Sequence, residues 1–475
     1  MEGIVAQIEA VNKVINDFVW GPPMLVLLIF TGIYMTIRTR FFQVTHFRHV
    51  LDNTILAIFK DKKVVKTKDH KAISQFQALS TALAATVGTG NIAGVATAIV
   101  SGGPGAVFWM WVSAFFGMMT NYSENVLGIY YREKNAKGEW AGGPMMYLEK
   151  GLHQKWLAVI FSIFCLVASF GIGNIAQINS ISTALQTSLQ IPLWVTGAVV
   201  ALVVAFVILG GLKRIASVTE KVVPFMALFY MLGTLAIIAM NYQHIGGAFG
   251  MIFSGAFNLQ AIGGGILGTV MANAIRYGLA RGVFSNEAGL GSSVMVHSSS
   301  DVKEPVRQGI WGIFEVFFDT IVICTLTALT ILTSGVYTGG EGLTGAALTM
   351  SAFTESFGVF GGIFTSVAVL LFAFSTILGW SFYGQRAAEY LGGLKFVPVY
   401  KVIFVIVVFI GAMSSVQVVW DISDTFNGLM AIPNLIGVLC LSPVVVKITK
   451  NYVSRYFKGE KIAPMLSAMD EEEEK

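Results

Sequence analysis

Charge is scarce in this 475-residue chain. Asp, Glu, Lys and Arg together make up 12% of the residues, whereas apolar residues make up 55%. Soluble domains carry about 25% charged residues because their surfaces face water. The composition therefore excludes a soluble fold and predicts an integral membrane protein. The net charge of +4 is small and the basic residues are distributed over separate loops, which argues against a nucleic-acid partner.

Cysteine and histidine are also rare, and their positions argue against an enzyme. The cysteines lie inside apolar runs without the spacing of metal ligands, so no cofactor is expected. The histidines are expected in loops or interfacial segments, which leaves no Ser–His pair at the membrane midplane, and no His-Glu-x-x-His string of a membrane metalloprotease occurs. The residues concerned are Cys165, Cys324, Cys440, His46, His49, His70, His153, His244 and His297.

Long apolar stretches are abundant, and they predict the number of membrane spans. A helical span needs about 20 apolar residues. Splitting the apolar stretches at Pro, Gly and polar clusters predicts eleven spans. They lie near residues 22–38, 74–101, 104–131, 156–188, 192–211, 222–240, 261–283, 308–334, 357–390, 399–417 and 422–446.

The distribution of Lys and Arg predicts the orientation in the membrane. If the N-terminus is outside, 30 of the 31 basic residues fall in inward segments and only Lys13 falls outside. The positive-inside rule then predicts a multi-pass protein of the cell membrane with its N-terminus outside and its C-terminus in the cytoplasm. Residues 41–60 mix apolar with charged residues and predict an amphipathic helix on the cytoplasmic surface. The acidic tail 470–475 has the composition of a disordered terminus.

Glycine clusters interrupt two of the spans. Between Ala84 and Gly94, three glycines beside Thr and Asn predict a helix break, because each Gly costs about 1 kcal/mol in a helix interior. A break at membrane depth leaves backbone groups that must line a cavity or bind a ligand. Close helix packing through small residues is the alternative. Residues 261–273 repeat the pattern five spans later and therefore in the opposite orientation, which indicates an inverted-repeat secondary transporter. A channel is the weaker alternative, since no repeated filter loop is present.

Four motifs resemble the alanine-or-glycine:cation symporter family, and the similarity covers essentially the whole chain. They are Thr86 to Asn91, Gly102-Gly-Pro-Gly105, Ala141 to Tyr147, and the long string Arg276 to Ser292. The resemblance implies an all-α LeuT-type fold of five plus five inverted helices, in which the first and sixth core helices are broken. It also implies sodium- or proton-coupled uptake of small neutral amino acids such as alanine and glycine.

The resemblance divides the chain into four parts. Residues 1–60 would hold one extra N-terminal span, 22–38, and the amphipathic helix. The first repeat would cover 72–240, the second repeat 241–447, and the cytoplasmic tail 448–475.

The resemblance also implies a sodium site between the first and eighth core helices. Its ligands would be the carbonyls of Ala84, Val87 and Phe372 and the hydroxyls of Ser375 and Thr376. Such neutral oxygens suit a hard cation. Ordinary bonding of the two hydroxyls to the carbonyls one turn earlier is the alternative.

The substrate's ammonium and carboxylate groups are expected to meet the backbone at the two breaks. Buried amides and a bulky Trp would complete a pocket for a side chain no larger than methyl, although amides also join helices and Trp also marks membrane interfaces. The expected substrate-binding residues are Thr86, Gly88, Thr89, Gly90, Asn91, Gln177, Thr269, Asn273 and Trp380.

Carboxylates inside the spans are costly and mark a pathway, a relay or a gate. Glu124 lies in the second core helix, and Glu315 and Asp319 share one face of the seventh. Arg276 and Arg281 end the sixth core helix and are the expected partners of Glu124 and Glu315. Ion pairs at an inner gate are the favoured interpretation, and a protonatable coupling site is the alternative.

Overall fold

The computed structural model describes residues 2–69, 71–257, 265–339, 342–414 and 417–467. This part of the chain is almost entirely helical, as the composition predicts. Its one sheet pairs β1 (Glu133–Lys134) with β2 (Trp140–Ala141) in antiparallel fashion, with Glu133 opposite Ala141.

The N-terminal half consists of helices that are in several places joined end to end by π-helical turns. The elements are α1 Glu2–Val19, α2 Pro22–Arg38, α3 Phe42–Thr45, α4 Phe47–Asn53, α5 Ile55–Lys60, α6 Lys62–Val65, α7 Gln75–Thr86, η1 Gly90–Gly94, α8 Val95–Gly102, α9 Gly105–Tyr130, α10 Pro144–Met146, η2 Tyr147–Gly151, α11 Lys155–Phe170, η3 Gly171–Ile175, α12 Ala176–Leu189, α13 Leu193–Leu209, α14 Gly211–Met240, η4 Tyr242–His244 and α15 Ile245–Ala256.

The C-terminal half follows the same plan. Its elements are α16 Gly265–Asn286, α17 Val294–His297, α18 Pro305–Val316, η6 Phe317–Cys324, α19 Thr325–Thr333, α20 Gly345–Phe357, α21 Val359–Gly392, α22 Val397–Gly411, α23 Gln417–Leu429, α24 Ala431–Cys440 and α25 Ser442–Lys458.

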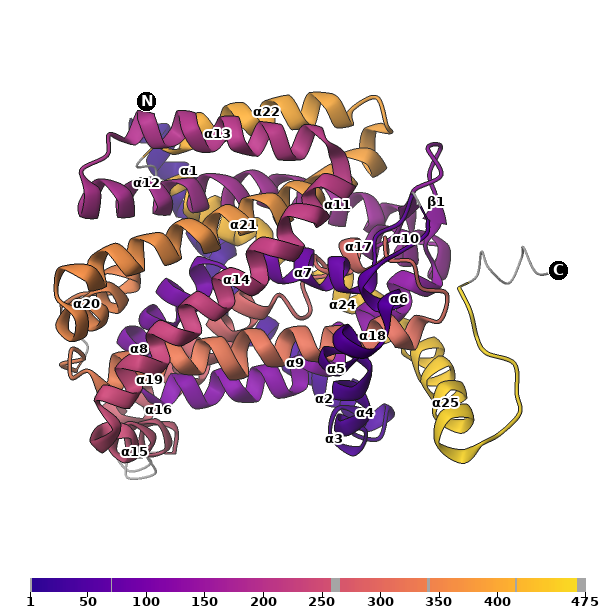
Figure 1. Cartoon of the computed structure of the whole chain (residues 1–475), viewed down its shortest axis with the longest axis horizontal. Coiled ribbons are helices and arrows are strands. Elements are labelled where there is room, and N and C mark those ends of the chain that lie inside the picture. The colour runs from indigo at the N-terminus through magenta and orange to yellow at the C-terminus, as the bar shows by residue number, and fades with distance from the viewer. Residues whose placement is uncertain (1, 70, 258–264, 340–341, 415–416, 468–475) are drawn as a thin grey trace.

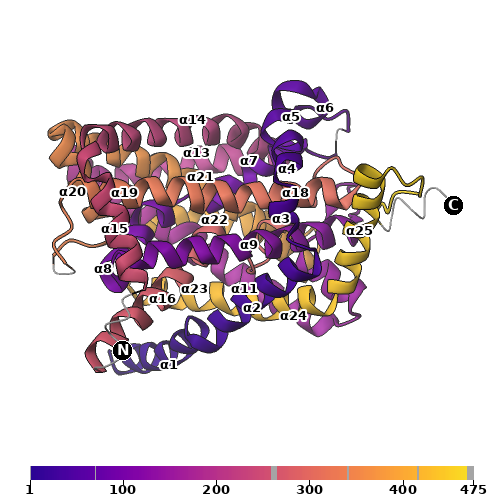
Figure 2. The ribbon, with the colours of Figure 1, turned by 90° about the horizontal axis from the view of Figure 1, so that it is seen from below.

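The long helices lie side by side in layers (Figure 1). α13 packs against α22 at one edge, α11 and α12 pack against α21 in the middle, and α16 and α18 pack against α9 on the other side. The short helices α3 to α6, α10 and α17 gather at one end of the bundle with α25, whereas α15 and α20 lie at the opposite end. α1 also lies at the end opposite to α25 (Figure 2).

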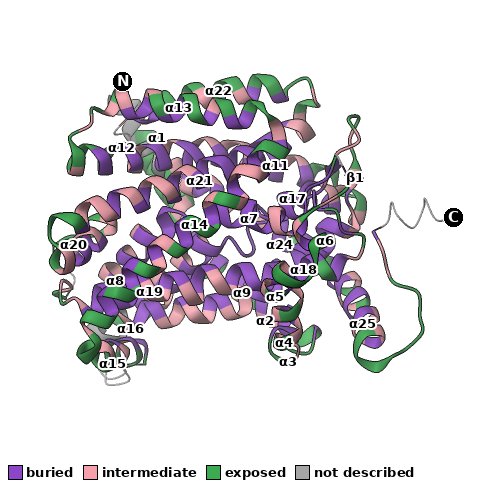
Figure 3. Cartoon of the chain, in the orientation of Figure 1, coloured by how far each residue is buried: buried purple, intermediate pink, exposed green. Residues whose placement is uncertain are grey.

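Buried residues fill the middle of the bundle, and the exposed faces of α13 and α22 are at its edge (Figure 3). The exposed side chains on these helices are apolar, for example Leu202 and Phe206, which are 72% and 70% exposed. Water would disfavour such a broad apolar surface, and a bilayer would accept it.

The helices support a multi-span membrane protein. Five of the described helices are long and apolar enough to cross a bilayer, and two bent helix pairs raise this number to seven. α13 and α22 are apolar but shorter, with 17 and 15 residues. The predicted count of eleven spans and the orientation of the termini remain predictions.

Three segments differ from the sequence analysis. α1 was not predicted; it precedes the first expected span and ends at a turn around Gly21. The single amphipathic helix predicted over 41–60 is wrong, because Phe41 is left-handed and the chain bends at His46 and Thr54, so α3, α4 and α5 form separately. α14 begins at Gly211, eleven residues before the expected 222. The acidic tail 470–475 lies outside the described residues.

Candidate functional site

The first glycine cluster breaks its span in the predicted place. α7 ends at Thr86, and the helix that continues from Gly90 to Gly102 is bent from it by 50°. The Gly88 N–H donates to Asn91 Oδ1 at 2.8 Å. In an unbroken helix it would donate to the Ala84 carbonyl, which therefore loses its helical donor.

Asp319 joins this break to a second one. Asn91 Nδ2 donates to Asp319 Oδ1 at 2.6 Å, and the hydroxyl of Ser285 donates to Asp319 Oδ2 at 2.8 Å. The neighbouring Thr320 hydroxyl also donates to Oδ2 at 2.8 Å. All four side chains are buried. Asp319, in the π-helical turn η6, thus connects the start of the first break with the last turn of α16.

The second break does not lie at 268–273, and that prediction is wrong. α16 is helical from Gly265 to Asn286 and includes those residues. The break follows Asn286, where Glu287, Gly289 and Gly291 all have positive φ angles of 56°, 95° and 76°. Left-handed backbone cannot continue a right-handed helix, and two alternate glycines accept it without strain. The alternate glycines inside the Arg276 to Ser292 motif are the sequence signal for this break.

Asn273 and Thr269 are therefore not at the second break. Asn273 lies thirteen residues before Asn286, or about 20 Å along the helix axis, and its carbonyl faces Gly102. The backbone of Thr269 is helical, and its side chain lies outside the described residues.

Trp380 is held by the second break. Its indole Nε1 donates to Glu287 Oε1 at 2.9 Å, and the Ser292 hydroxyl donates to Glu287 Oε2. Trp380 is fully buried, and a Cβ at Gly173 would collide with it. Trp380 is thus in the protein interior and not in an interfacial belt. Glu287 was missed by the sequence analysis, although it lies in the long motif.

The five residues predicted for the cation site come from two elements that pack together. α21 carries Phe372, Ser375 and Thr376, and α7 packs against it. The Thr376 hydroxyl donates to the Phe372 carbonyl at 2.9 Å and lies 3.5 Å from the Ala85 carbonyl. A Cβ at Gly88 would collide with the same hydroxyl. Ala84, Val87 and Phe372 belong to one buried cluster.

The hydroxyls of this cluster are bonded to the turn before them, which was the alternative interpretation. Ser375 Oγ donates to the Phe372 carbonyl at 2.8 Å and also lies 3.2 Å from Met226 Sδ. A hydroxyl that donates its proton still keeps lone pairs for a cation. The donor set consists of neutral oxygens in a buried place, and it fits Na⁺.

Gln177 reaches the first break from α12. The Thr89 hydroxyl donates to Gln177 Oε1 at 3.2 Å, and Gln177 Nε2 donates to the Ile172 carbonyl at 3.0 Å. The π-helical turn η3 ends at Ile175, two residues before Gln177, and its wider turn changes the helix face on which Gln177 lies. The Thr86 hydroxyl is bonded to the Ala82 carbonyl of its own helix at 3.3 Å.

A cavity of about 270 Å³ opens beside the first break. Thr89 and Gly90 line one wall, and Arg281 and Phe284 of α16 together with Asp424 of α23 line another. An adjoining cavity of about 210 Å³ shares Arg281, Phe284 and Asp424 and extends to α1.

The two arginines of α16 lie in these cavities, and their predicted partnership with Glu124 and Glu315 is wrong. Arg276 forms an ion pair with Asp17 of α1 at 3.5 Å. Arg281 lies over the Phe284 ring, 5.3 Å from its centroid. Because α16 continues to Asn286, both arginines lie before its end, and both line the cavity that extends to α1.

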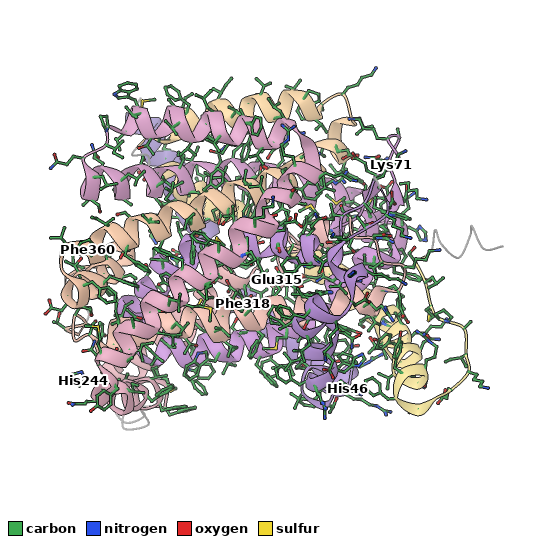
Figure 4. All side chains as sticks on the ribbon, viewed as in Figure 1. His46, Lys71, His244, Glu315, Phe318 and Phe360 are labelled. Atoms are coloured by element: carbon green, nitrogen blue, oxygen red, sulfur yellow. The ribbon has the colours of Figure 1, made fainter. Side chains whose placement is uncertain are left out.

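Glu124 and Glu315 have partners other than the two arginines. Glu124 Oε1 accepts from the Gly289 N–H at 3.1 Å and from the Asn434 amide. Glu315 Oε2 lies 2.9 Å from His297 Nε2, and His297 Nδ1 lies 2.6 Å from the Gln308 amide. Figure 4 shows Glu315 inside the bundle, between Lys71 at one end and His244 at the other.

His297 is fully buried, so the expectation that all six histidines lie in loops or interfaces is wrong for this residue. The segment after α16 does not leave the protein. It turns at the second break and forms α17, which packs against α7 and α9. The loop predicted between the spans that end at 283 and begin at 308 is therefore partly helical and buried.

The fold is that of LeuT-type transporters. A structure of MhsT in complex with L-phenylalanine superposes with a TM-score of 0.54 at 12% identity, covering 80% of this chain and 99% of that one. A mutant manganese transporter of Eremococcus coleocola superposes with a TM-score of 0.50 at 15% identity, covering 84% of each chain. At these identities the two superpositions show a shared fold.

The sequence comparison defines the family. Residues 5–465 match the sodium:alanine symporter family, and the chain belongs to it. The sodium/alanine symporter AgcS of Methanococcus maripaludis is 50% identical over 94% of this chain and 97% of its own. The probable sodium/glutamine symporter GlnT of Bacillus subtilis is 36% identical over 95% and 92%.

Proposed function

We propose that this protein imports alanine and glycine together with Na⁺ by alternating access. The observation that carries the proposal is that Asp319 bridges the two helix breaks through Asn91 and Ser285. Two facing breaks offer backbone N–H groups to a carboxylate and carbonyls to an ammonium group, which together match a zwitterionic amino acid. The name of the archaeal relative supports alanine as the substrate.

The coupling ion is Na⁺, held by the carbonyls of Ala84, Val87 and Phe372 and the hydroxyls of Ser375 and Thr376. The proximity of Thr376 to Gly88 supports this site, because it brings α21 to the end of α7 where the Ala84 carbonyl has lost its helical donor. Na⁺ would neutralise the carbonyl dipoles exposed by the break and favour the closed packing of α7 on α21.

Substrate enters through the cavity beside Thr89 and Gly90. Arg281 attracts the substrate carboxylate. Asp424 attracts the ammonium group, since Asp424 Oδ1 has no hydrogen-bond partner among the described residues. The substrate then binds at the breaks between residues 86–91 and 285–292, with Gln177 and Trp380 at its sides. Both side chains leave little room beyond a methyl group.

The cavity lies toward α1, the predicted outer face. On the opposite face, the bonds of Glu287 to Trp380 and of Glu124 to Asn434 close the path. Alternating access would require these bonds to open while the cavity closes. If Arg276 and Arg281 are counted on the outer face, 28 of the 31 basic residues still lie on the predicted inner face. This excess of basic residues supports the orientation with the N-terminus outside.

The proposed architecture has eleven spans, with the inverted repeats at 72–240 and 241–447 preceded by α2. The sixth core helix then consists of α16 and α17 with the break at 287–292 between them. This assignment gives each repeat a broken first helix.

The test is uptake of labelled alanine into proteoliposomes under an imposed sodium gradient, a proton gradient, or neither. The proposal expects accumulation with the sodium gradient alone, and glycine but not leucine or glutamine should compete. Accumulation with the proton gradient alone would make Asp319 and Glu315 the better coupling groups. Ligand-gated current without accumulation would indicate a channel.

A further inference from the structure

A further cavity, of about 650 Å³, lies at the end of the bundle opposite to the substrate cavity. Residues 65–67, Ala72 and the first turn of α7 form one wall, and the first turns of α14 form the other. Its lining residues are Val65, Lys66, Thr67, Ala72, Phe76, Gln77, Lys213, Ser217, Glu220 and Lys221.

The cavity has an excess of positive charge. Lys66, Lys213 and Lys221 face one carboxylate, that of Glu220. Within the described part of the chain, none of these lysines forms an ion pair, and the nearest polar partner is the Asp69 carbonyl, 3.5 Å from Lys213 Nζ. Three ammonium groups around one cavity are a suitable site for a phosphate group.

The same face of α14 continues into an apolar, exposed stripe. Lys221 is followed at helical spacing by Phe225, Leu228 and Leu232, which are 61%, 57% and 59% exposed. Residues at i, i+4, i+7 and i+11 share one face of a helix. The polar cavity and the lipid-facing stripe are therefore continuous along α14, and Lys221 stands at their boundary.

We propose that this cavity binds the phosphate headgroup of an anionic phospholipid, whose acyl chain lies along Phe225, Leu228 and Leu232. A free phosphate ion would use the lysines alone, whereas a lipid uses both the lysines and the stripe. Basic pockets at the cytoplasmic end of membrane helices bind such headgroups by the same combination. This inference does not depend on the transported substrate.

The experiment measures lipid binding to the whole protein in detergent by native mass spectrometry, with phosphatidylglycerol and with phosphatidylcholine. The wild type should bind phosphatidylglycerol more tightly than phosphatidylcholine. The triple variant Lys66→Gln/Lys213→Gln/Lys221→Gln should bind it at least about tenfold more weakly, because each lysine near the headgroup contributes about 1 kcal/mol. Phe225→Ser should also weaken binding.

The matched control is Lys60→Gln/Lys62→Gln/Lys63→Gln, which removes the same charge from α5 and α6 outside the cavity. It should keep the wild-type affinity. If both triple variants lose the same affinity for phosphatidylglycerol, binding depends only on total surface charge, and the proposed lipid site is wrong. Displacement of the lipid by millimolar inorganic phosphate, together with an unchanged Phe225→Ser variant, would assign the cavity to a free anion instead.

Discussion

Asn91 and Asp319 form a direct link between the first helix break and the seventh core helix. Asn91 uses both ends of its amide: Oδ1 accepts the Gly88 N–H at 2.8 Å, and Nδ2 donates to Asp319 at 2.6 Å. The residue therefore shapes the break and orients the carboxylate that holds α16. One side chain thus maintains the geometry on which the proposed substrate site depends.

Replacement of Asn91 by Ala should reduce both stability and alanine uptake. The change leaves the Gly88 N–H and one Asp319 oxygen without their partner, and each buried unsatisfied group costs about 1–3 kcal/mol. Uptake in proteoliposomes and thermal unfolding measure the two effects. Asn273→Ala is the control, because Asn273 lies far from the break, and it should behave nearly as the wild type. Similar losses in both variants would contradict the assignment of Asn91.

Gly88→Ala should abolish the sodium dependence of alanine binding. The added Cβ would collide with the Thr376 hydroxyl and separate α7 from α21, whereas a Cβ at Gly250 of α15 would meet nothing within 4 Å. Gly250→Ala is therefore the matched control and should retain sodium-dependent binding. If Gly88→Ala keeps the wild-type response to sodium, Thr376 and the end of α7 do not form the cation site.

Trp380→Phe should weaken closure of the inner path while keeping the pocket filled. It removes the indole N–H that bonds Glu287, so one buried carboxylate oxygen loses a donor, at a cost of about 1–3 kcal/mol. We expect slower uptake and a lower melting temperature. Trp194→Phe, at a side chain that is 60% exposed, should change neither quantity. A Trp380→Phe protein with unchanged uptake would show that this bond has no part in closure.

Arg281→Gln should lower the affinity for external alanine. Its guanidinium lines the substrate cavity, and a charge-assisted hydrogen bond is worth about 1.5–3 kcal/mol, so a loss of affinity of at least about tenfold is expected. Arg276→Gln should have a smaller effect, since Arg276 is paired with Asp17. Substrate binding to the purified variants measures the difference. If the Arg281→Gln protein binds alanine normally but transports it poorly, Arg281 acts in a gate and not in substrate binding.

The apolar composition predicted several membrane-spanning helices, because a helix that crosses a bilayer needs about 20 apolar residues. The first of them, 22–38, coincides with α2, and the break near Asn91 was predicted because three glycines occur together with polar residues. The second break was misplaced, because glycine content alone does not determine whether a helix breaks. The structure tolerates Gly268 inside α16, whereas Gly289 and Gly291 occupy left-handed backbone.

The partners of the buried charges could not be predicted from the sequence. The error at 268–273 ended α16 too early and placed Arg276 and Arg281 at the wrong face. Because of the same error, the following segment was predicted as a loop, and His297 was not predicted to be buried. His297 contacts Glu315, which lies eighteen residues later in the sequence. Asn434 meets Glu124 from a distant part of the chain, and only the packing of α24 near α9 brings them together.

Sodium and alanine are proposed to bind at adjacent sites, sodium between α7 and α21, and alanine between the two helix breaks beside Trp380 of α21. By linkage, sodium must then tighten alanine binding by the same factor by which alanine tightens sodium binding. The decisive measurement is alanine affinity as a function of sodium concentration for the wild type and for the Ser375→Ala and Thr376→Ala variants. Alanine affinity should rise with sodium in the wild type, and both variants should lose most of this rise. Variants that keep the wild-type sodium dependence, or wild-type binding that ignores sodium and responds only to pH, would contradict it.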